Sequence, residues 1–112
     1  MALYFLTGTP KNLLEAFKAA IDAGHIKTWA YDTAGDFTHS ATQWNKEAWL
    51  KPTLEKDRLT LNILPPKNKT ITWEIYGVYH GRFIESMIIH CNQFFTQGIA
   101  TSKPATGDTI QG

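Results

Sequence analysis

The chain has 112 residues, a length that suits a single domain. Its formal net charge is +1, from 11 Lys and Arg against 10 Asp and Glu, and no run of basic residues concentrates positive charge. Nucleic-acid binders usually carry a concentrated basic patch, so this pattern argues against a nucleic-acid partner. No apolar stretch approaches the roughly 20 residues of a membrane span, so we expect no membrane association.

Aromatic residues make up 12% of the chain, with four Trp, four Tyr and six Phe. Large rings bury much area per residue, so we expect an adequate core without disulfides or a structural metal. Cys91 is the single cysteine and has no partner for an intramolecular disulfide. The first six residues lack the basic start and the apolar length of a signal peptide. Together these features favour a reducing, cytoplasmic location.

A strand followed by a helix is expected near the N-terminus. Residues 3–7 are short and apolar, which is typical of a buried strand. Thr9 and Pro10 predict a helix start, because the N–H that Pro lacks would have no partner in the first turn. The apolar residues of one helical face then follow: Leu13, Phe17, Ala20 and Ile21. Gly24 predicts a left-handed stop.

The next segment predicts strands and turns. Residues 26–31 alternate between two faces, which predicts a strand. Residues 32–36, with their Asp and Gly, predict a turn, and residues 37–39 are expected to return as a second strand. Residues 40–43 have the form of a capping box, which predicts a short helical turn directly afterwards. An irregular strand through residues 48–50 is the alternative, and the sequence does not separate the two.

A further strand is expected in the middle of the chain. Pro52 has no N–H to donate, which argues against a central strand position near it. Residues 54–59 read as a polar turn between apolar residues. Alternation then resumes with Leu59, Leu61 and Ile63 on one face, which predicts a half-buried strand ending at a loop over residues 65–69.

The most informative segment is 70–97, where the apolar spacing changes period. In its first part, apolar residues stand at odd-numbered positions, as in a strand with one apolar face: Ile71, Trp73, Ile75 and Tyr79. The residues of its second part that follow helical spacing are Phe83, Ile84, Met87, Ile88, Cys91, Phe94 and Phe95. This switch predicts a strand over residues 71–79 that runs into an amphipathic helix over residues 83–95. We expect Phe83, Met87 and Phe94 to be largely buried.

The order of elements predicts an α+β fold: a single layer of mostly antiparallel sheet, of four to six strands, with two helices packed on one face. Gly98 is expected to close the second helix, and residues 99–101 to add a short edge strand. Residues 102–112 hold one isolated apolar residue, Ile110, and we expect them to form a mobile tail. Residues 1–101 are then the single domain.

The clearest pocket candidate is the predicted strand–helix junction, whose aromatic and charged residues are Tyr76, Tyr79, His80 and Arg82. His80 titrates near neutrality, and Arg82 offers a planar fork for anions. Gly77 and Gly81 leave space there for a ligand or for a neighbouring element. A structural role is the favoured alternative, with the rings in the core and His80 as a cap or surface residue.

Other motifs favour structural roles. Asp32, Asp36 and His39 are close enough in sequence to ligate a divalent metal, but Asp is common in turns and the spacing matches no known metal pattern. The link over residues 7–11 offers backbone N–H groups for an anion, yet it lacks the repeated glycines of a phosphate loop. No Gly-x-Ser-x-Gly nucleophile elbow occurs. We therefore expect no catalytic residues, no metal and no cofactor.

The candidate interface residues are Trp29 and Tyr31, which share a face of one predicted strand, and Ile89, which falls on a polar helix face. A small antiparallel sheet must cover its edges and second face, and two identical copies can do so by two-fold pairing, the commonest oligomeric symmetry. The alternative is that the large rings fill the core. We favour a non-enzymatic module that forms a homodimer or binds another protein. The second hypothesis is a small-ligand binder or small enzyme at the strand–helix junction.

Overall fold

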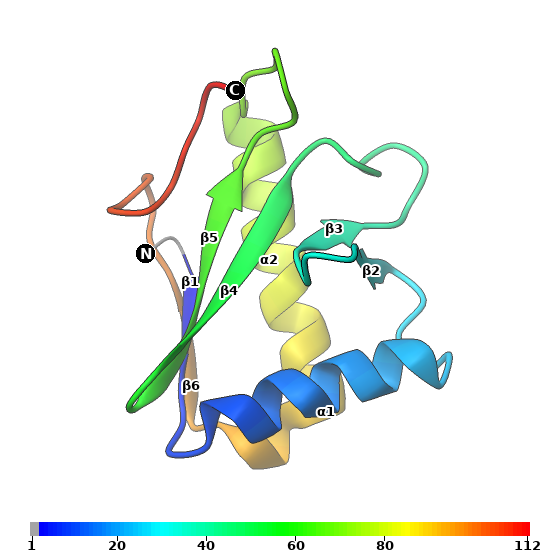
Figure 1. Cartoon of the computed structure of the whole chain (residues 1–112), viewed down its shortest axis with the longest axis vertical. Helices are drawn as coiled ribbons and strands as arrows, with labels where there is room; N and C mark the ends of the chain where they lie inside the picture. Colours follow the sequence, from blue (N-terminus) through cyan, green and yellow to red (C-terminus); the bar gives the residue numbers. More distant parts are fainter. Residues whose placement is uncertain (1–2) are drawn as a thin grey trace.

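The computed structural model describes residues 3–112 and has the predicted α+β architecture. Its elements in chain order are β1 (Leu3–Leu6), α1 (Pro10–Asp22), β2 (Trp29–Tyr31), β3 (Phe37–His39), β4 (Trp49–Glu55), β5 (Arg58–Leu64), α2 (Trp73–Cys91), the 3-10 turn η1 (Asn92–Phe94) and β6 (Gln97–Ala100). The strands of the described residues form one antiparallel sheet in the order β2-β3-β4-β5-β1-β6. Helix α2 runs along this sheet, and α1 crosses it at one end (Figure 1).

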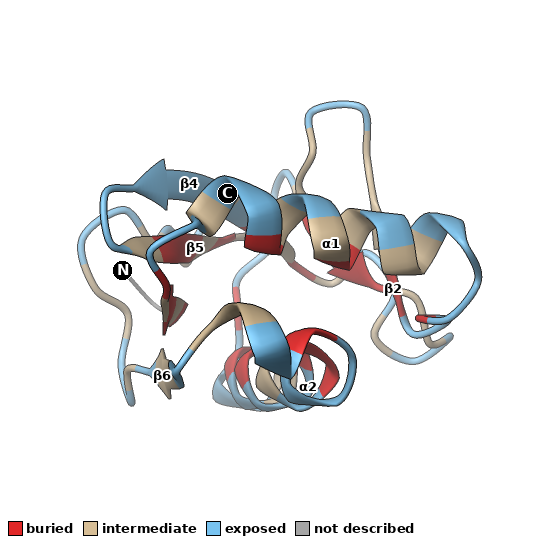
Figure 2. Ribbon diagram, turned by 90° about the horizontal axis from the view of Figure 1, so that it is seen from below, coloured by how far each residue is buried: buried red, intermediate tan, exposed pale blue. Residues whose placement is uncertain are grey.

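The core lies between the sheet and the two helices. The alternation in β5 turns Leu59, Leu61 and Ile63 inward, as the sequence predicts, and all three are fully buried. On the helix side, Phe17 of α1 and Phe83 of α2 are also fully buried, with ring centroids 4.7 Å apart. Figure 2 shows the buried parts of β5, α1 and α2 facing one another. Both helices therefore cover one face of the sheet.

The first half of the chain follows the predicted order, with a shorter second strand. The strand expected over residues 26–31 is limited to β2. The N–H groups of His25 and Ile26 instead donate to the carbonyl of Ala20, at 2.9 and 3.2 Å, which ties both residues to the last turn of α1. The predicted turn at 32–36 is confirmed, with Gly35 in the left-handed region at a φ of 86°.

Residues 41–47 form consecutive turns, with the N–H groups of Trp44 and Asn45 bonded to the carbonyl of Ala41. Strand β4 then begins at Trp49, so each of the two alternatives for this segment describes part of it. Pro52 lies inside β4, which is central in the strand order, and our expectation there was wrong. The reason is that β3 pairs with β4 only between Phe37 and Leu50. At Pro52 the side of β4 that faces β3 is therefore unpaired, so no N–H donor is needed there.

The largest departure from the sequence prediction is in the strand expected over residues 71–79, because residues 73–79 are instead the start of α2. The Thr72 hydroxyl caps this helix by accepting a hydrogen bond from the Ile75 N–H at 3.2 Å. Tyr76, Tyr79 and Phe83 are spaced by three and four residues, and all three are buried on one helical face. Burial of this face decides the conformation, and the short alternation was coincidental.

Helix α2 ends at Cys91, whereas we expected it to continue to Gly98. Gly98 belongs to the edge strand β6 and has a packing role there. A Cβ atom at this position would lie 2.9 Å from Cε1 of the buried Phe5 ring, so only glycine lets β6 approach the core this closely. Phe94, in the turn η1, is partly buried and not largely buried as predicted.

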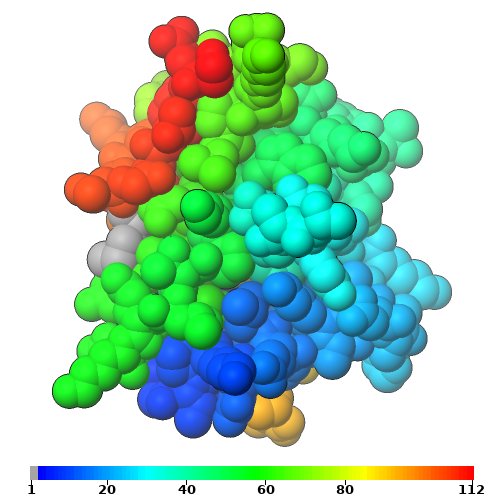
Figure 3. Space-filling model, viewed as in Figure 1, coloured from blue at the N-terminus to red at the C-terminus, as the bar shows by residue number. Residues whose placement is uncertain are grey.

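Residues 102–112 lie against the top of β5 and the segment that leads into α2, as the orange and red atoms of Figure 3 show. Asp108 Oδ1 accepts a hydrogen bond from the Ile63 N–H at 3.1 Å. The Ile71 N–H donates to the Ile110 carbonyl at 2.8 Å, and the Ile110 side chain packs against the core. These contacts are anchors that the composition of the segment does not reveal. Its mobility stays a prediction.

Candidate functional site

The four residues of the predicted ligand site all lie within α2 and do not form one pocket. Tyr76, Tyr79 and His80 are buried and face the core, whereas Arg82 is exposed. His80 and Arg82 are two residues apart on an α-helix, so they project on nearly opposite sides of it, about 200° apart around the helix axis. The expected junction is absent because the strand that would have formed it is helical, so the structure separates the imidazole from the guanidinium.

Tyr76 and His80 form a stacked pair, with ring centroids 3.9 Å apart and planes inclined by 23°. The Nδ1 atom of His80 lies 2.7 Å from the Tyr76 carbonyl oxygen, so it carries the proton and donates. The Nε2 atom is buried and has no hydrogen-bond partner among residues 3–112. Burial lowers the pKa of His80, against the opposing effects of the carbonyl bond and Asp108. The imidazole is therefore neutral at neutral pH.

The Tyr79 hydroxyl joins α2 to the loop before β4. It donates to the Trp44 carbonyl and accepts from the Ala48 N–H at 3.3 Å. It also lies 3.1 Å from the Thr38 hydroxyl. Thr38 Oγ1 in turn donates to the Ala48 carbonyl and accepts from the Lys46 N–H, both at 3.0 Å. Tyr79 and Thr38 thus fix the loop in place, which is a structural role.

Two of the three predicted interface residues are engaged within the chain. Trp29 is only 2% exposed and packs edge-on against Phe83, with centroids 5.0 Å apart. Tyr31 is partly buried, and its hydroxyl donates to Asp22 Oδ1 at 2.7 Å, a hydrogen bond that raises the pKa of Tyr31. Lys18 also lies over the Tyr31 ring, 5.2 Å from its centroid. Trp29 belongs to the core, so it cannot face a partner in this structure.

The three residues weighed as metal ligands have separate structural roles. Asp32 Oδ1 accepts hydrogen bonds from the N–H groups of Ala34 and Asp36, at 3.0 and 2.9 Å. Burial raises the pKa of Asp36, with a further contribution from the Asp32 charge. His39 is buried, and burial lowers its pKa. Within the described part of the chain, no group of three or more His, Cys, Asp and Glu side chains is placed to hold a metal ion.

The outer face of α2 is the most apolar exposed surface of the described residues. Four large apolar side chains are exposed among the described residues, and three of them belong to α2: Trp73 at 66%, Ile88 at 49% and Ile89 at 63%. The fourth, Leu54, is 46% exposed at the hairpin between β4 and β5. A single exposed apolar side chain is ordinary, whereas several on one helix make that helix a candidate contact surface.

Two glycines leave the helix backbone uncovered on this face. Trp73, Gly77, Gly81, Ile84 and Ile88 follow one another at spacings of three or four residues, and we call this set the outer stripe. A Cβ atom at Gly77 or Gly81 would meet nothing within 4 Å, so the helix backbone is open there. Beside the outer stripe, Ile84 Cγ2 lies 3.7 Å from the position that a Cβ atom would take at Gly98 in β6. The outer stripe is therefore a strip of largely exposed apolar side chains and open helix backbone beside the edge strand β6.

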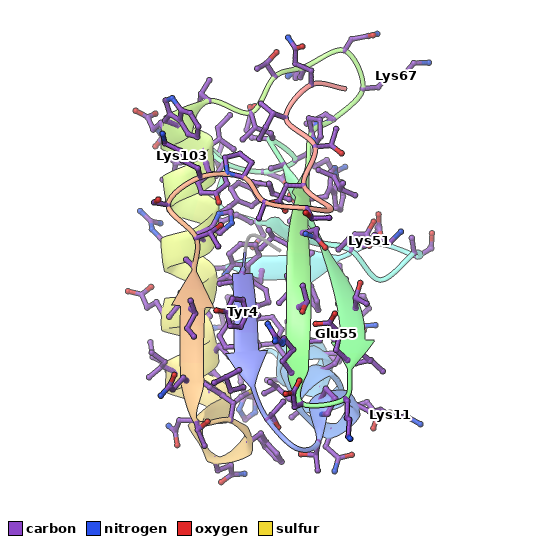
Figure 4. All side chains as sticks on the ribbon, turned by 90° about the vertical axis from the view of Figure 1, so that its left-hand side faces the viewer. Tyr4, Lys11, Lys51, Glu55, Lys67 and Lys103 are labelled. Carbon is purple, nitrogen blue, oxygen red and sulfur yellow. The ribbon has the colours of Figure 1, made fainter. Side chains whose placement is uncertain are left out.

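The outer face of the sheet is different, because polar groups cover it. Arg58 lies over the Tyr4 ring, 4.9 Å from its centroid, and is 3.7 Å from the Glu55 carboxylate. Glu55 also accepts a hydrogen bond from the Thr60 hydroxyl at 2.6 Å. Figure 4 looks onto strands β6, β1, β5 and β4, with Tyr4 and Glu55 labelled. Arg58 and Glu55 therefore make polar contacts on this face, which leaves α2 as the candidate apolar interaction surface.

Comparison with protein-family models, with curated proteins and with solved structures found no match. Separately, none of the helices in the described residues is long and apolar enough to cross a membrane.

Sequence reasoning missed the outer stripe because it placed Trp73 in a strand and Ile88 in the core. Ile89 was identified as exposed, and the structure bears this out. The missing signal was the helix start. Thr72, with Glu74 in the first turn, is a recognisable N-terminus, and a helix counted from there places Trp73, Gly77 and Gly81 on one side.

Proposed function

We propose that this protein is a non-enzymatic interaction module that forms a homodimer through the outer stripe of α2 and the adjoining edge strand β6. The observation that carries the proposal is that three of the four exposed large apolar side chains lie on α2. When such side chains are buried against a second copy, each Å² of apolar surface removed from water contributes about 25 cal/mol to the free energy of association. A location in the cytoplasm belongs to the same proposal, and the buried, unpaired Cys91 thiol is compatible with it.

The order of residues along the outer stripe supports pairing with an identical helix. Trp73 and Gly77 lie as far before the midpoint of the stripe as Ile88 and Ile84 lie after it. If two copies of α2 pack antiparallel about a two-fold axis, Trp73 meets Ile88 of the second copy. Gly77 meets Ile84, so a side chain enters the space that a glycine leaves. Such self-complementarity is what a two-fold interface requires.

The size of the stripe indicates that β6 also takes part. Residues 73–88 span about 24 Å along the helix axis, at 1.5 Å per residue. A stable interface buries roughly 800 Å² on each partner, which is more than one helical stripe supplies. Strand β6 ends the sheet and lies directly beside Ile84, so it extends the surface without a gap. We expect a dissociation constant in the micromolar range.

The alternative function is a small-ligand binder or small enzyme at Tyr76, His80 and Arg82. It has less support, because Tyr76 and His80 are stacked inside the core and Arg82 is exposed on another side of the helix. The partner-free Nε2 of His80 is the feature that favours it. Tyr31 and Ile89 remain secondary candidates for the interface, since both reach the surface.

Sedimentation equilibrium of matched variants tests the proposal. The unchanged chain should show twice its 12.6 kDa mass at micromolar concentration. Ile88→Glu places a charge in the outer stripe and should give a folded monomer. Leu54→Glu makes the same change at the exposed apolar residue outside α2 and should leave the dimer intact. Circular dichroism and thermal melts check that both variants fold.

A single-chain mass for the unchanged protein throughout the micromolar range would disprove the dimer. If Leu54→Glu dissociates the dimer and Ile88→Glu does not, the interface lies at the hairpin. Ile89→Asp measures how far the contact extends around α2, because Ile88 and Ile89 project about 100° apart. Trp29→Ser is not a useful interface probe, since Trp29 packs in the core and its loss would destabilise the fold.

A further inference from the structure

A hollow of about 290 Å³ opens beside the sheet end formed by β2 and β3. It is separate from the outer stripe and from the predicted Tyr76–His80 site. The residues that line it are Ala30, Tyr31, Asp32, Thr38, Asn45, Lys46 and Trp49. Three strands and the loop before β4 contribute, so residues distant in sequence converge there. This volume suits a small molecule of about ten non-hydrogen atoms and is near the lower end of the range for ligand pockets.

The floor and one wall of the hollow are apolar. Ala30 and Thr38 are paired across β2 and β3. The pairing of Phe37 with Leu50 places Trp49 next in this cross-strand row. The Thr38 oxygen is engaged with Ala48 and Lys46, so its methyl group is the part left for the hollow. A flat ring can therefore lie on small side chains and stack on an indole.

The rim of the hollow is polar and held in place. Lys46 adopts the left-handed region at a φ of 60°, which is unfavourable for a residue with a side chain. The bond from its N–H to Thr38, which contacts Tyr79 in turn, maintains this conformation. No ion pair to the Lys46 ammonium occurs in the described part of the chain. On the β2 side, Asp32 contributes a carboxylate that accepts hydrogen bonds.

We propose that this hollow binds a small planar ring that carries a carboxylate at one end and a hydroxyl donor at the other. The ring stacks on Trp49, over the floor made by Ala30 and Thr38. The carboxylate meets the unpaired Lys46 ammonium, and the hydroxyl donates to Asp32. The fixed loop supplies the preorganisation that limits the entropy cost of binding. The strain at Lys46 is consistent with a position held for contact with a ligand.

Binding is tested by NMR titration with 4-hydroxybenzoate, and 4-hydroxybenzamide serves as the matched uncharged probe. We expect 4-hydroxybenzoate to shift the Trp49 indole and the Asn45 and Lys46 amide resonances, with a dissociation constant on the order of millimolar. The amide should bind about fivefold more weakly, the upper range for one exposed ion pair. Equal binding of the two probes, or shifts confined to other residues, would overturn the proposal.

Matched variants locate the contact. Lys46→Asn removes the charge and keeps a residue that tolerates the left-handed conformation, so folding is preserved. It should weaken 4-hydroxybenzoate binding about fivefold and leave 4-hydroxybenzamide binding unchanged. Lys51→Asn removes a cation from β4 outside the hollow and should change neither affinity by more than about twofold. If Lys51→Asn weakens binding as much as Lys46→Asn, the attraction is general to the surface and no Lys46 site exists.

Discussion

The two faces of α2 differ sharply although they share one helix. The inner face presents Tyr79, Phe83 and Met87, all fully buried, and Phe83 alone contacts the rings of Phe5, Phe17, Trp29 and Phe37. The outer face presents Trp73, Ile88 and Ile89, which are about half to two-thirds exposed, around two open glycines. Substitutions on the inner face should therefore change stability, and those on the outer face should change association.

The inner face also contains polar groups that folding has to satisfy. The Tyr79 hydroxyl is bonded to backbone groups of the loop, whereas His80 Nε2 is buried without a partner in the described residues. Burying an unpaired acceptor costs roughly 1–3 kcal/mol. On the outer face, Trp73, Ile88 and Ile89 expose apolar groups that form no hydrogen bonds with water. Apolar residues alone therefore do not identify a core, because α2 places similar residues on both of its faces.

The largest expected effect is at the centre of the inner face. Phe83→Ala should lower the free energy of unfolding by about 3–5 kcal/mol, because the ring is fully buried among other rings. Phe94→Ala should cost less, about 1–2 kcal/mol, since Phe94 is only partly buried. Urea melts of both variants measure the difference. Equal losses would mean that η1 contributes to the core as much as α2 does.

The next effect concerns the C-terminal segment, which covers the beginning of the inner face. Composition alone predicts that deleting residues 105–112 leaves the melting temperature unchanged. The contacts of Asp108 with Ile63 and the packing of Ile110 instead predict a loss of about 2–3 kcal/mol. Thermal melts of the truncated chain decide between these outcomes, and Asp108→Ala isolates the hydrogen-bonding part. An unchanged melting temperature would establish that the segment is mobile.

A smaller effect should appear as the pH is lowered. Burial lowers the pKa of His80, so the unfolded chain takes up a proton at a higher pH than the folded chain does. Stability is therefore complete above the unfolded-state pKa of about 6.5 and declines as the pH falls toward the folded-state pKa. Between pH 7.5 and 5.5 we expect His80 to account for part of the decline in the free energy of unfolding.

Urea melts at the two pH values measure this decline. His80→Phe keeps a ring beside Tyr76 but removes the titrating group, so it should reduce the pH dependence. His39, also buried with a lowered pKa, should account for the remainder. A decline that His80→Phe does not alter would assign it to other groups.

The smallest expected effect has the opposite sign and lies on the outer face. Gly81→Ala should stabilise the monomer by about 0.5–1 kcal/mol, because alanine is the better helix former and its methyl group meets no neighbour. In the proposed dimer the same methyl group lies in the contact between the two outer stripes, so the dimer should dissociate more readily in sedimentation equilibrium. A variant that is both more stable and more strongly dimeric would contradict close packing of the two helices at Gly81.

The sequence by itself determined the α+β class, the first strand and helix, the turn at residues 32–36 and the inward residues of β5. These features depend on local rules. Pro10 after Thr9 fits the first turn of a helix, Asp32 caps its own turn, and strict alternation in Leu59, Leu61 and Ile63 specifies a strand with one buried face. Each rule involves groups within a few residues of one another, so no knowledge of the rest of the chain was needed.

Tertiary structure alone decided the start of α2, the exposure of Trp73 and Ile88, and the docking of residues 102–112. Residues 71–79 fit a period of two as well as a helical period, and burial of Tyr76 and Tyr79 against the sheet selected the helix. Apolar spacing gives the side of a helix on which a residue lies, but not which side meets the sheet. The Asp108 bond to Ile63 joins residues 45 positions apart, a distance over which local patterns carry no information.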